Sequence, residues 1–168
     1  MAIRMRINKT LKKEIVALCK KYGVKYRIRL QNDSLADVNL NLVIIGYGFK
    51  SKTINRENFR QYMLSVTCHE ICHILAAREG KFKIYHLDIS SRAMSESELR
   101  ATIQTGWRAE KYVDRRAKEI LRANYPDLKY MGYRQADKPS YDKFLDGFRK
   151  ELEWRKHKNR KERDSWRL

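Results

Sequence analysis

The 168-residue sequence predicts an α+β domain that is mostly helical and carries a small N-terminal β-sheet. Two patterns lead to this class. Long stretches place apolar residues at helical spacing, and two short stretches near the N-terminus have the apolar residues of strands. Only seven Gly and two Pro favour long helices, and 42% hydrophobic residues suffice for a core despite 35% charged residues.

The N-terminal part is expected to hold one helix and the sheet. Residues 9–22 form an amphipathic helix that stops at Gly23. Apolar and basic residues alternate over residues 24–30, which predicts a half-exposed strand with one face in water. Residues 31–37 are polar and turn-like, and residues 38–45 end in a continuous apolar run, as a more buried strand does.

Two long helices are expected to follow the sheet. Residues 55–79 form the first, opened by Asn55 as a cap and closed by Gly80 just past its end. A short extended piece over residues 82–87 comes next. A long helix then runs from its cap at Ser95 to about residue 124.

The C-terminal part is expected to be a basic helix beginning near Tyr141. We therefore expect two units along the chain. Residues 1–137 make the main domain, and residues 138–168 make a basic helical extension that packs on this domain or trails it.

The charge of the chain is strongly positive and unevenly placed. It carries 38 Lys and Arg against 20 Asp and Glu, a net charge of +18. Residues 1–31 contribute +9 and residues 149–168 contribute +5, while residues 32–80 are neutral. A field of this sign attracts nucleic acid, acidic proteins or anionic surfaces, with a merely solvated surface as the alternative.

The composition also bears on the cellular compartment. No stretch approaches the roughly 20 apolar residues of a membrane-spanning helix, so we expect no membrane partner. Lys12, Lys13 and Glu14 interrupt the apolar run that a secretory signal would need. Three cysteines are a sparse and odd set, typical of a reducing compartment, and Cys68 and Cys72 are expected to be small core residues. We expect a cytoplasmic protein.

The motif that indicates chemistry is the H-E-x-x-H string His69-Glu70-Ile71-Cys72-His73. Residues four apart share a helical face, so two imidazoles can reach one metal while Glu70 sits beside them. A shuffled chain of this composition would contain the string about 0.006 times. Two histidines packed in a core helix without a metal are therefore the weaker interpretation. The pattern predicts a zinc site with Glu70 as the general base.

A catalytic zinc site needs a third protein ligand, and two candidates are present. The long helix places Glu110 and Asp114 four residues apart on one face, where Glu110 can bind zinc and Asp114 can accept the N–H of a liganding histidine. Such a pair also occurs in any charged helix. The competing ligand is His86, thirteen residues after His73.

The sequence resembles the ImmA/IrrE group of zinc metallopeptidases, which occur in phages, integrative elements and bacteria. The resemblance covers about residues 10–125. It lies in the strand over residues 40–45, in the helix with His69-Glu70-x-x-His73-Ile74-Leu75, and in the later helix with Glu110-x-x-x-Asp114-x-x-Ala117-x-x-Ile120-Leu121. This resemblance implies a zincin-like fold and Glu110 as the third zinc ligand.

The H-E-x-x-H string also resembles the SprT-like proteases, in which a further histidine is the third ligand and the substrates are DNA-bound proteins. That resemblance would favour His86. The small zinc-ribbon that accompanies these proteases would need a CxxC pair, and the chain has none.

The function predicted from the sequence is a zinc-dependent metallopeptidase. Its substrate would be a protein or peptide, including a DNA-bound regulator, and Glu70 would deprotonate the attacking water. The alternative is a basic nucleic-acid-binding or phage accessory protein whose zinc site is structural or inactive. A further donor to the oxyanion is expected among Tyr85, His86 and Tyr112.

Overall fold

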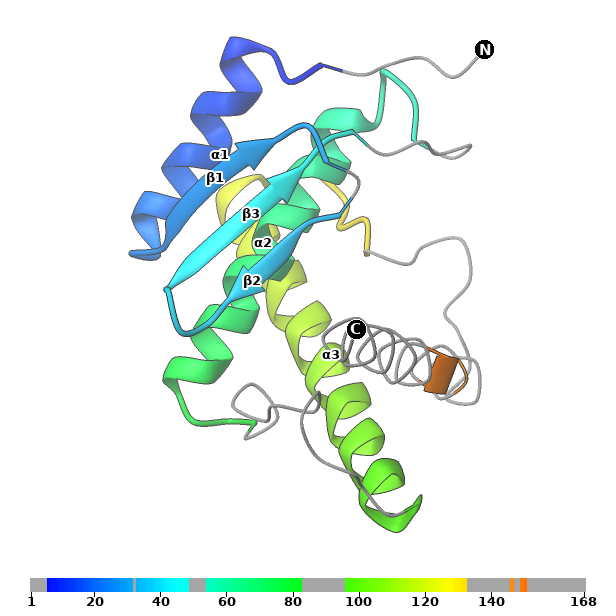
Figure 1. Cartoon of the computed structure of the whole chain (residues 1–168). Coiled ribbons are helices and arrows are strands. Elements are labelled where there is room, and N and C mark those ends of the chain that lie inside the picture. The colour runs from blue at the N-terminus through cyan, green and yellow to red at the C-terminus, as the bar shows by residue number, and fades with distance from the viewer. Residues whose placement is uncertain are drawn as a thin grey trace, which may run out of the picture.

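The structure is a computed structural model, and it describes residues 6–31, 33–48, 54–82, 96–132, 146 and 149–150. Three helices and three strands make up the named elements of these residues. Their order is α1 (Lys9–Lys21), β1 (Lys25–Arg29), β2 (Leu35–Asp37), β3 (Leu42–Gly46), α2 (Phe59–Arg78) and α3 (Glu96–Asn124). Figure 1 shows the sheet as one layer, with helices packed behind it. The α+β class is therefore confirmed.

The sheet is mixed, with the order β1-β3-β2. β1 pairs in parallel with the central strand β3, and β2 pairs antiparallel with β3. Four of the five β3 residues are buried, whereas four of the five β1 residues are exposed. The expected contrast between a half-exposed and a buried strand is thus present, although the buried strand begins at Leu42 and not at residue 38.

β2 lies where we predicted only a turn, and long-range contacts explain it. The Oγ of Ser34 accepts a hydrogen bond of 2.9 Å from the backbone N–H of Gly46. A Cβ on Gly46 would lie 2.3 Å from the backbone oxygen of Asp33, so only glycine allows this approach. Asn41, with φ of 52°, then closes the short β2–β3 connection in a left-handed conformation that asparagine tolerates.

α1 has the boundaries of its predicted helix to within one residue, and its caps explain them. The side chain of Asn8 accepts a 2.8 Å hydrogen bond from the N–H of Leu11. At the other end, Gly23 takes a φ of +63°, and the N–H groups of Gly23 and Val24 bond back to the carbonyls of Lys20 and Cys19. α1 therefore stops where the glycine was predicted to stop it.

α2 is the central helix of the core and is buried around most of its circumference. It contacts α1, α3, β2 and β3. Phe59, Met63, Leu64 and Ile71 are among its buried side chains, and Cys68 and Cys72 are free and buried, as predicted for small core residues. Because neighbours fix α2 on several sides, side chains on it are held in defined positions.

The predicted start of α2 was four residues too early. The Oδ1 of Asn55 accepts hydrogen bonds from the N–H groups of Glu57 and Asn58, which makes it the cap of a preceding turn. The end agrees with prediction. Gly80, at φ +64°, and Lys81 bond back to the carbonyls of Ala77 and Ala76.

α3 packs against α2 through a stripe of residues spaced by four. Ala109, Val113 and Ala117 are buried, and the two alanines allow the helix axes to approach closely. α3 covers most of the predicted helix from Ser95 to about residue 124, although Ser95 itself lies outside the described residues. Glu110 and Asp114 lie next to this stripe, so their side chains reach α2.

Some predictions fall on parts of the chain that the structure does not describe. His86, Tyr85, the boundary at residue 137 and nearly all of the C-terminal extension over 138–168 lie outside the described residues. None of the helices in the described ranges combines the length and the apolar composition that a membrane crossing requires.

Candidate metal centre

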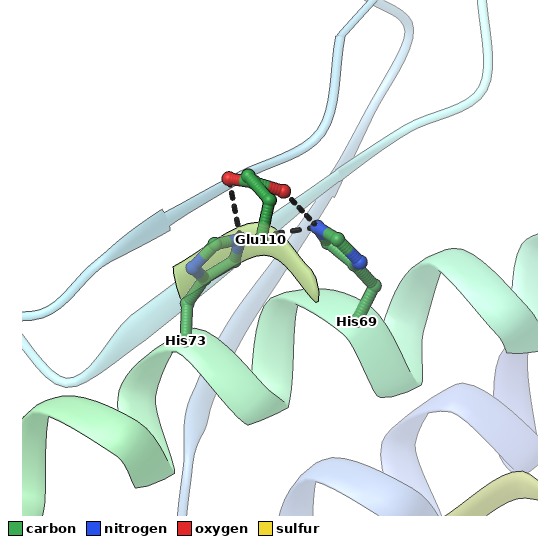
Figure 2. A group of neighbouring side chains, drawn as sticks. All are labelled: His69, His73 and Glu110. Carbon is green, nitrogen blue, oxygen red and sulfur yellow. Dashed lines mark hydrogen bonds and ion pairs between the residues drawn. The ribbon is translucent and has the colours of Figure 1, made fainter. Parts of the chain in front are cut away.

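Three predicted ligands meet between α2 and α3. The Nε2 atoms of His69 and His73 are 3.0 Å apart. The Glu110 carboxylate places one oxygen 3.3 Å from Nε2 of His69 and the other 3.5 Å from Nε2 of His73. Figure 2 shows both imidazoles side by side on α2, with the carboxylate reaching over them from α3. The structure therefore brings His69, His73 and Glu110 together as one possible metal-binding group.

The size of this triangle fits a zinc ion. Zinc lies about 2.0–2.1 Å from nitrogen and oxygen ligands, so two ligands on a tetrahedral ion are about 3.3 Å apart. The observed separations of 3.0, 3.3 and 3.5 Å lie close to this distance on either side. Imidazole nitrogen and carboxylate oxygen are also the donors that zinc takes in catalytic sites. The residues present thus fit the metal that the motif implies.

Asp114 orients His69 by a direct contact. Its Oδ1 lies 3.0 Å from Nδ1 of His69. An ionised carboxylate only accepts hydrogen bonds, so Nδ1 carries the proton and donates it, and Nε2 is the nitrogen turned toward Glu110. Asp114 therefore accepts a hydrogen bond from a histidine of the H-E-x-x-H string, as predicted.

Tyr130 is a member of this cluster that the sequence analysis missed. Its hydroxyl donates a 2.7 Å hydrogen bond to Oδ1 of Asp114 and lies 3.3 Å from Nδ1 of His69. The next residue, Met131, is anchored to α2 because its N–H donates to Oγ of Ser65. Tyr130 is sixteen residues from Asp114, beyond the end of α3, and no local spacing signals this contact.

The surroundings of the two imidazoles shift their pKa values in opposite directions. Burial alone would lower the pKa of His69. The hydrogen bonds to Asp114 and Glu110, together with the charges of Glu70 and Glu110, outweigh burial and raise the pKa to about 10. For His73, burial prevails and lowers the pKa to about 4. One imidazole thus holds a positive charge that carboxylates stabilise, and the other presents a neutral nitrogen.

Glu70 has the environment of a proton-transferring carboxyl. Glu70 is only 4% exposed to solvent. Burial raises its pKa to about 7; the charge of Glu110 adds to the increase and the charge of His69 opposes it. The carboxyl is therefore poised to exchange a proton near neutral pH.

Tyr112, one of the three predicted oxyanion donors, has other partners. Its hydroxyl donates a 3.2 Å hydrogen bond to Glu79 and accepts one of 3.1 Å from Arg116. These bonds, together with the ion pair of Arg116 and Glu79, join the end of α2 to α3. Tyr112 therefore ties together the two helices that carry the ligands.

Comparisons of the chain with protein-family models, with curated proteins and with solved structures give no match. The geometry of the described residues therefore carries the functional argument.

Proposed function

We propose that the chain is a zinc-dependent peptidase of the zincin type. His69, His73 and Glu110 would hold the ion, and Glu70 would act as the general base. One observation carries this proposal. The three ligand atoms are separated by the distances that a tetrahedral zinc site requires, and the carboxyl of Glu70 is buried beside them. When bound, zinc polarises a carbonyl and lowers the pKa of water toward about 7.

The chain's own residues supply the proton transfers. Glu70, with its pKa raised by burial, accepts a proton from the water whose oxygen adds to the peptide carbonyl carbon. The same carboxyl returns a proton to the amine nitrogen as the C–N bond breaks. Asp114 and Tyr130 hold the ring of His69, so its Nε2 faces the ligand position throughout.

The sheet offers a place for an extended substrate. β2 is an edge of the three-stranded sheet and contacts α2, which carries His69 and Glu70. A peptide that adds to this edge as a further strand would run beside α2. The substrate class we propose is an extended segment of a protein.

The test is zinc content and peptide hydrolysis in a set of single variants. We expect about one zinc per wild-type chain, a large loss of zinc in His73→Ala and Glu110→Ala, and retained zinc with lost hydrolysis in Glu70→Gln. Glu119→Gln is the matched control, because it removes an exposed carboxylate from the same helix as Glu110. An unstructured peptide library serves as the substrate.

Two outcomes would redirect the proposal. Loss of zinc in His86→Ala with zinc retained in Glu110→Ala would favour the SprT-like ligand set. A wild-type protein that takes up no zinc when supplied with it would refute the peptidase.

A further inference from the structure

A row of exposed cations runs along α1 and around the β1 edge of the sheet. The two elements contact one another, and Figure 1 shows α1 alongside β1. We call this row the α1–β1 basic surface. It consists of Arg6, Lys9, Lys12, Lys13, Lys20, Lys25, Arg27 and Arg29, all of which are exposed.

These charges are not neutralised locally. Glu14 is the only acidic residue between positions 6 and 31, and its carboxylate is bound by Arg60 of α2 through hydrogen bonds of 3.0 and 2.5 Å. Within the described ranges, no carboxylate forms an ion pair with any member of the α1–β1 basic surface. The surface therefore projects a concentrated positive field.

A cavity of about 490 Å³ adjoins the start of α1 and extends this surface inward. Arg6 lines it from the α1 side and Arg56 from the turn before α2, while Arg60 of α2, which also lines it, is paired with Glu14. Guanidinium groups bind phosphate oxygens in a bidentate manner. The cavity volume is within the range of sites that hold small molecules, so a phosphate with its attached sugar has room there.

We propose that the α1–β1 basic surface binds the phosphate backbone of nucleic acid. α1 has 13 residues and spans about 20 Å, a distance over which a DNA duplex carries about twelve phosphates on its two strands. The four lysines of the surface on α1 are spread over most of this length, so they can contact several phosphates of a regular polyanion. This role goes beyond the proposed peptidase and does not depend on it.

The packing of α1 argues against an anionic membrane as the partner. Leu11, Ile15 and Leu18 occupy the apolar face of α1 and are at most 3% exposed, because they pack into the core. A helix that binds a membrane by its apolar face needs that face free. α1 would have to leave the core to insert, whereas phosphate binding uses only its exposed side.

The surface and the candidate metal centre use different neighbours of α2. α1 packs on α2 and is joined to it by Glu14 and Arg60, while the metal ligands lie between α2 and α3. Nucleic acid on α1 and β1 would leave the metal centre open to a protein. A chain bound in this way could meet proteins that share the same nucleic acid.

The test measures binding of the full chain to a fluorescent 20-base-pair DNA duplex between 50 and 200 mM salt. Lys25→Gln, Arg27→Gln and Arg29→Gln are combined in one variant. Three exposed cations of α3, changed together, form the charge-matched control: Arg108→Gln, Lys118→Gln and Arg122→Gln. Thermal unfolding verifies that both variants fold.

We expect the β1 variant to bind at least tenfold more weakly and to reduce the slope of log affinity against log salt by up to about 2.7, at about 0.9 per lost phosphate contact. The α3 control should stay within about twofold of wild type. Absence of duplex binding by the wild type at 50 mM salt would overturn the proposal. Equal losses in both variants would do so as well, and so would binding to vesicles of anionic lipid without binding to the duplex.

Discussion

Replacing Asp114 by Asn tests whether the carboxylate that contacts His69 supports metal binding. Asparagine keeps the size of the side chain and a carbonyl oxygen that can accept from Nδ1 of His69, but it removes the negative charge 3.0 Å from that atom. Partners of this kind typically contribute 10- to 100-fold to metal affinity. We therefore expect zinc affinity to fall by that factor, or by about 1.4–2.7 kcal/mol.

The same change has a predicted thermal signature. At zinc about 1,000-fold above the wild-type Kd, binding stabilises the folded protein by about 4.1 kcal/mol. Asp114→Asn would lose about 1.4–2.7 kcal/mol of this, a decrease in Tm of about 3–11 °C for a chain of this size. Without zinc, Asp114→Asn should still lower Tm, because Asp114 helps to raise the pKa of His69 to about 10, but the loss should be smaller than with zinc.

The assay is competition for zinc against a chromogenic chelator, with thermal unfolding in parallel. Glu119→Gln, which removes an exposed carboxylate from the same helix, controls for net charge and should retain the wild-type affinity. An Asp114→Asn affinity within threefold of that control would refute the orienting role of Asp114. An equal Tm loss with and without zinc would instead show that the residue serves folding.

Three further predictions concern other residues of the site and the sheet. Tyr130→Phe removes the 2.7 Å hydrogen bond to Asp114, and we expect chelator competition to show a weaker zinc affinity, but a smaller loss than in Asp114→Asn. Glu70 has a folded pKa of about 7 against an ordinary 4.5, so its ionisation destabilises the zinc-free fold as pH rises through 7. Urea unfolding with chelator should find Glu70→Gln more stable than wild type by up to about 3 kcal/mol at pH 8, with the difference vanishing below about pH 4.5. Gly46→Ala places a Cβ 2.3 Å from the Asp33 carbonyl oxygen, so urea unfolding should show a clear loss of stability; an unchanged midpoint would contradict the tight approach of the two segments.

The parts of the site that the sequence predicts are those with local periodicity. His69 and His73 are one helical turn apart, and so are Glu110 and Asp114, so each pair shares a helical face once its helix forms. That the two faces meet depends on how α3 packs on α2. The buried stripe of Ala109, Val113 and Ala117 accounts for this packing only after the structure is known.

The features that the sequence does not predict rest on contacts between distant residues. β2 has only three residues, and its place depends on Ser34 bonding to Gly46 twelve positions later. Tyr130 bonds to Asp114 sixteen positions earlier, and the next residue, Met131, is fixed to Ser65 on α2. Asn55 is a residue type that often caps helices, but here it caps the turn before α2. Local patterns carry no information on such partners.

The division of the ligands between two helices has a topological consequence. His73 and Glu110 are 37 positions apart in the sequence, so an ion bound by both would close a loop of that length. By the chain-entropy relation used for disulfides, a cross-link over such a loop lowers the conformational entropy of the unfolded chain. This stabilises the folded state by about 3.8 kcal/mol. Zinc would then be a reversible cross-link between α2 and α3. Unlike a disulfide, this cross-link would not be cleaved in a reducing compartment, and a chelator would remove it.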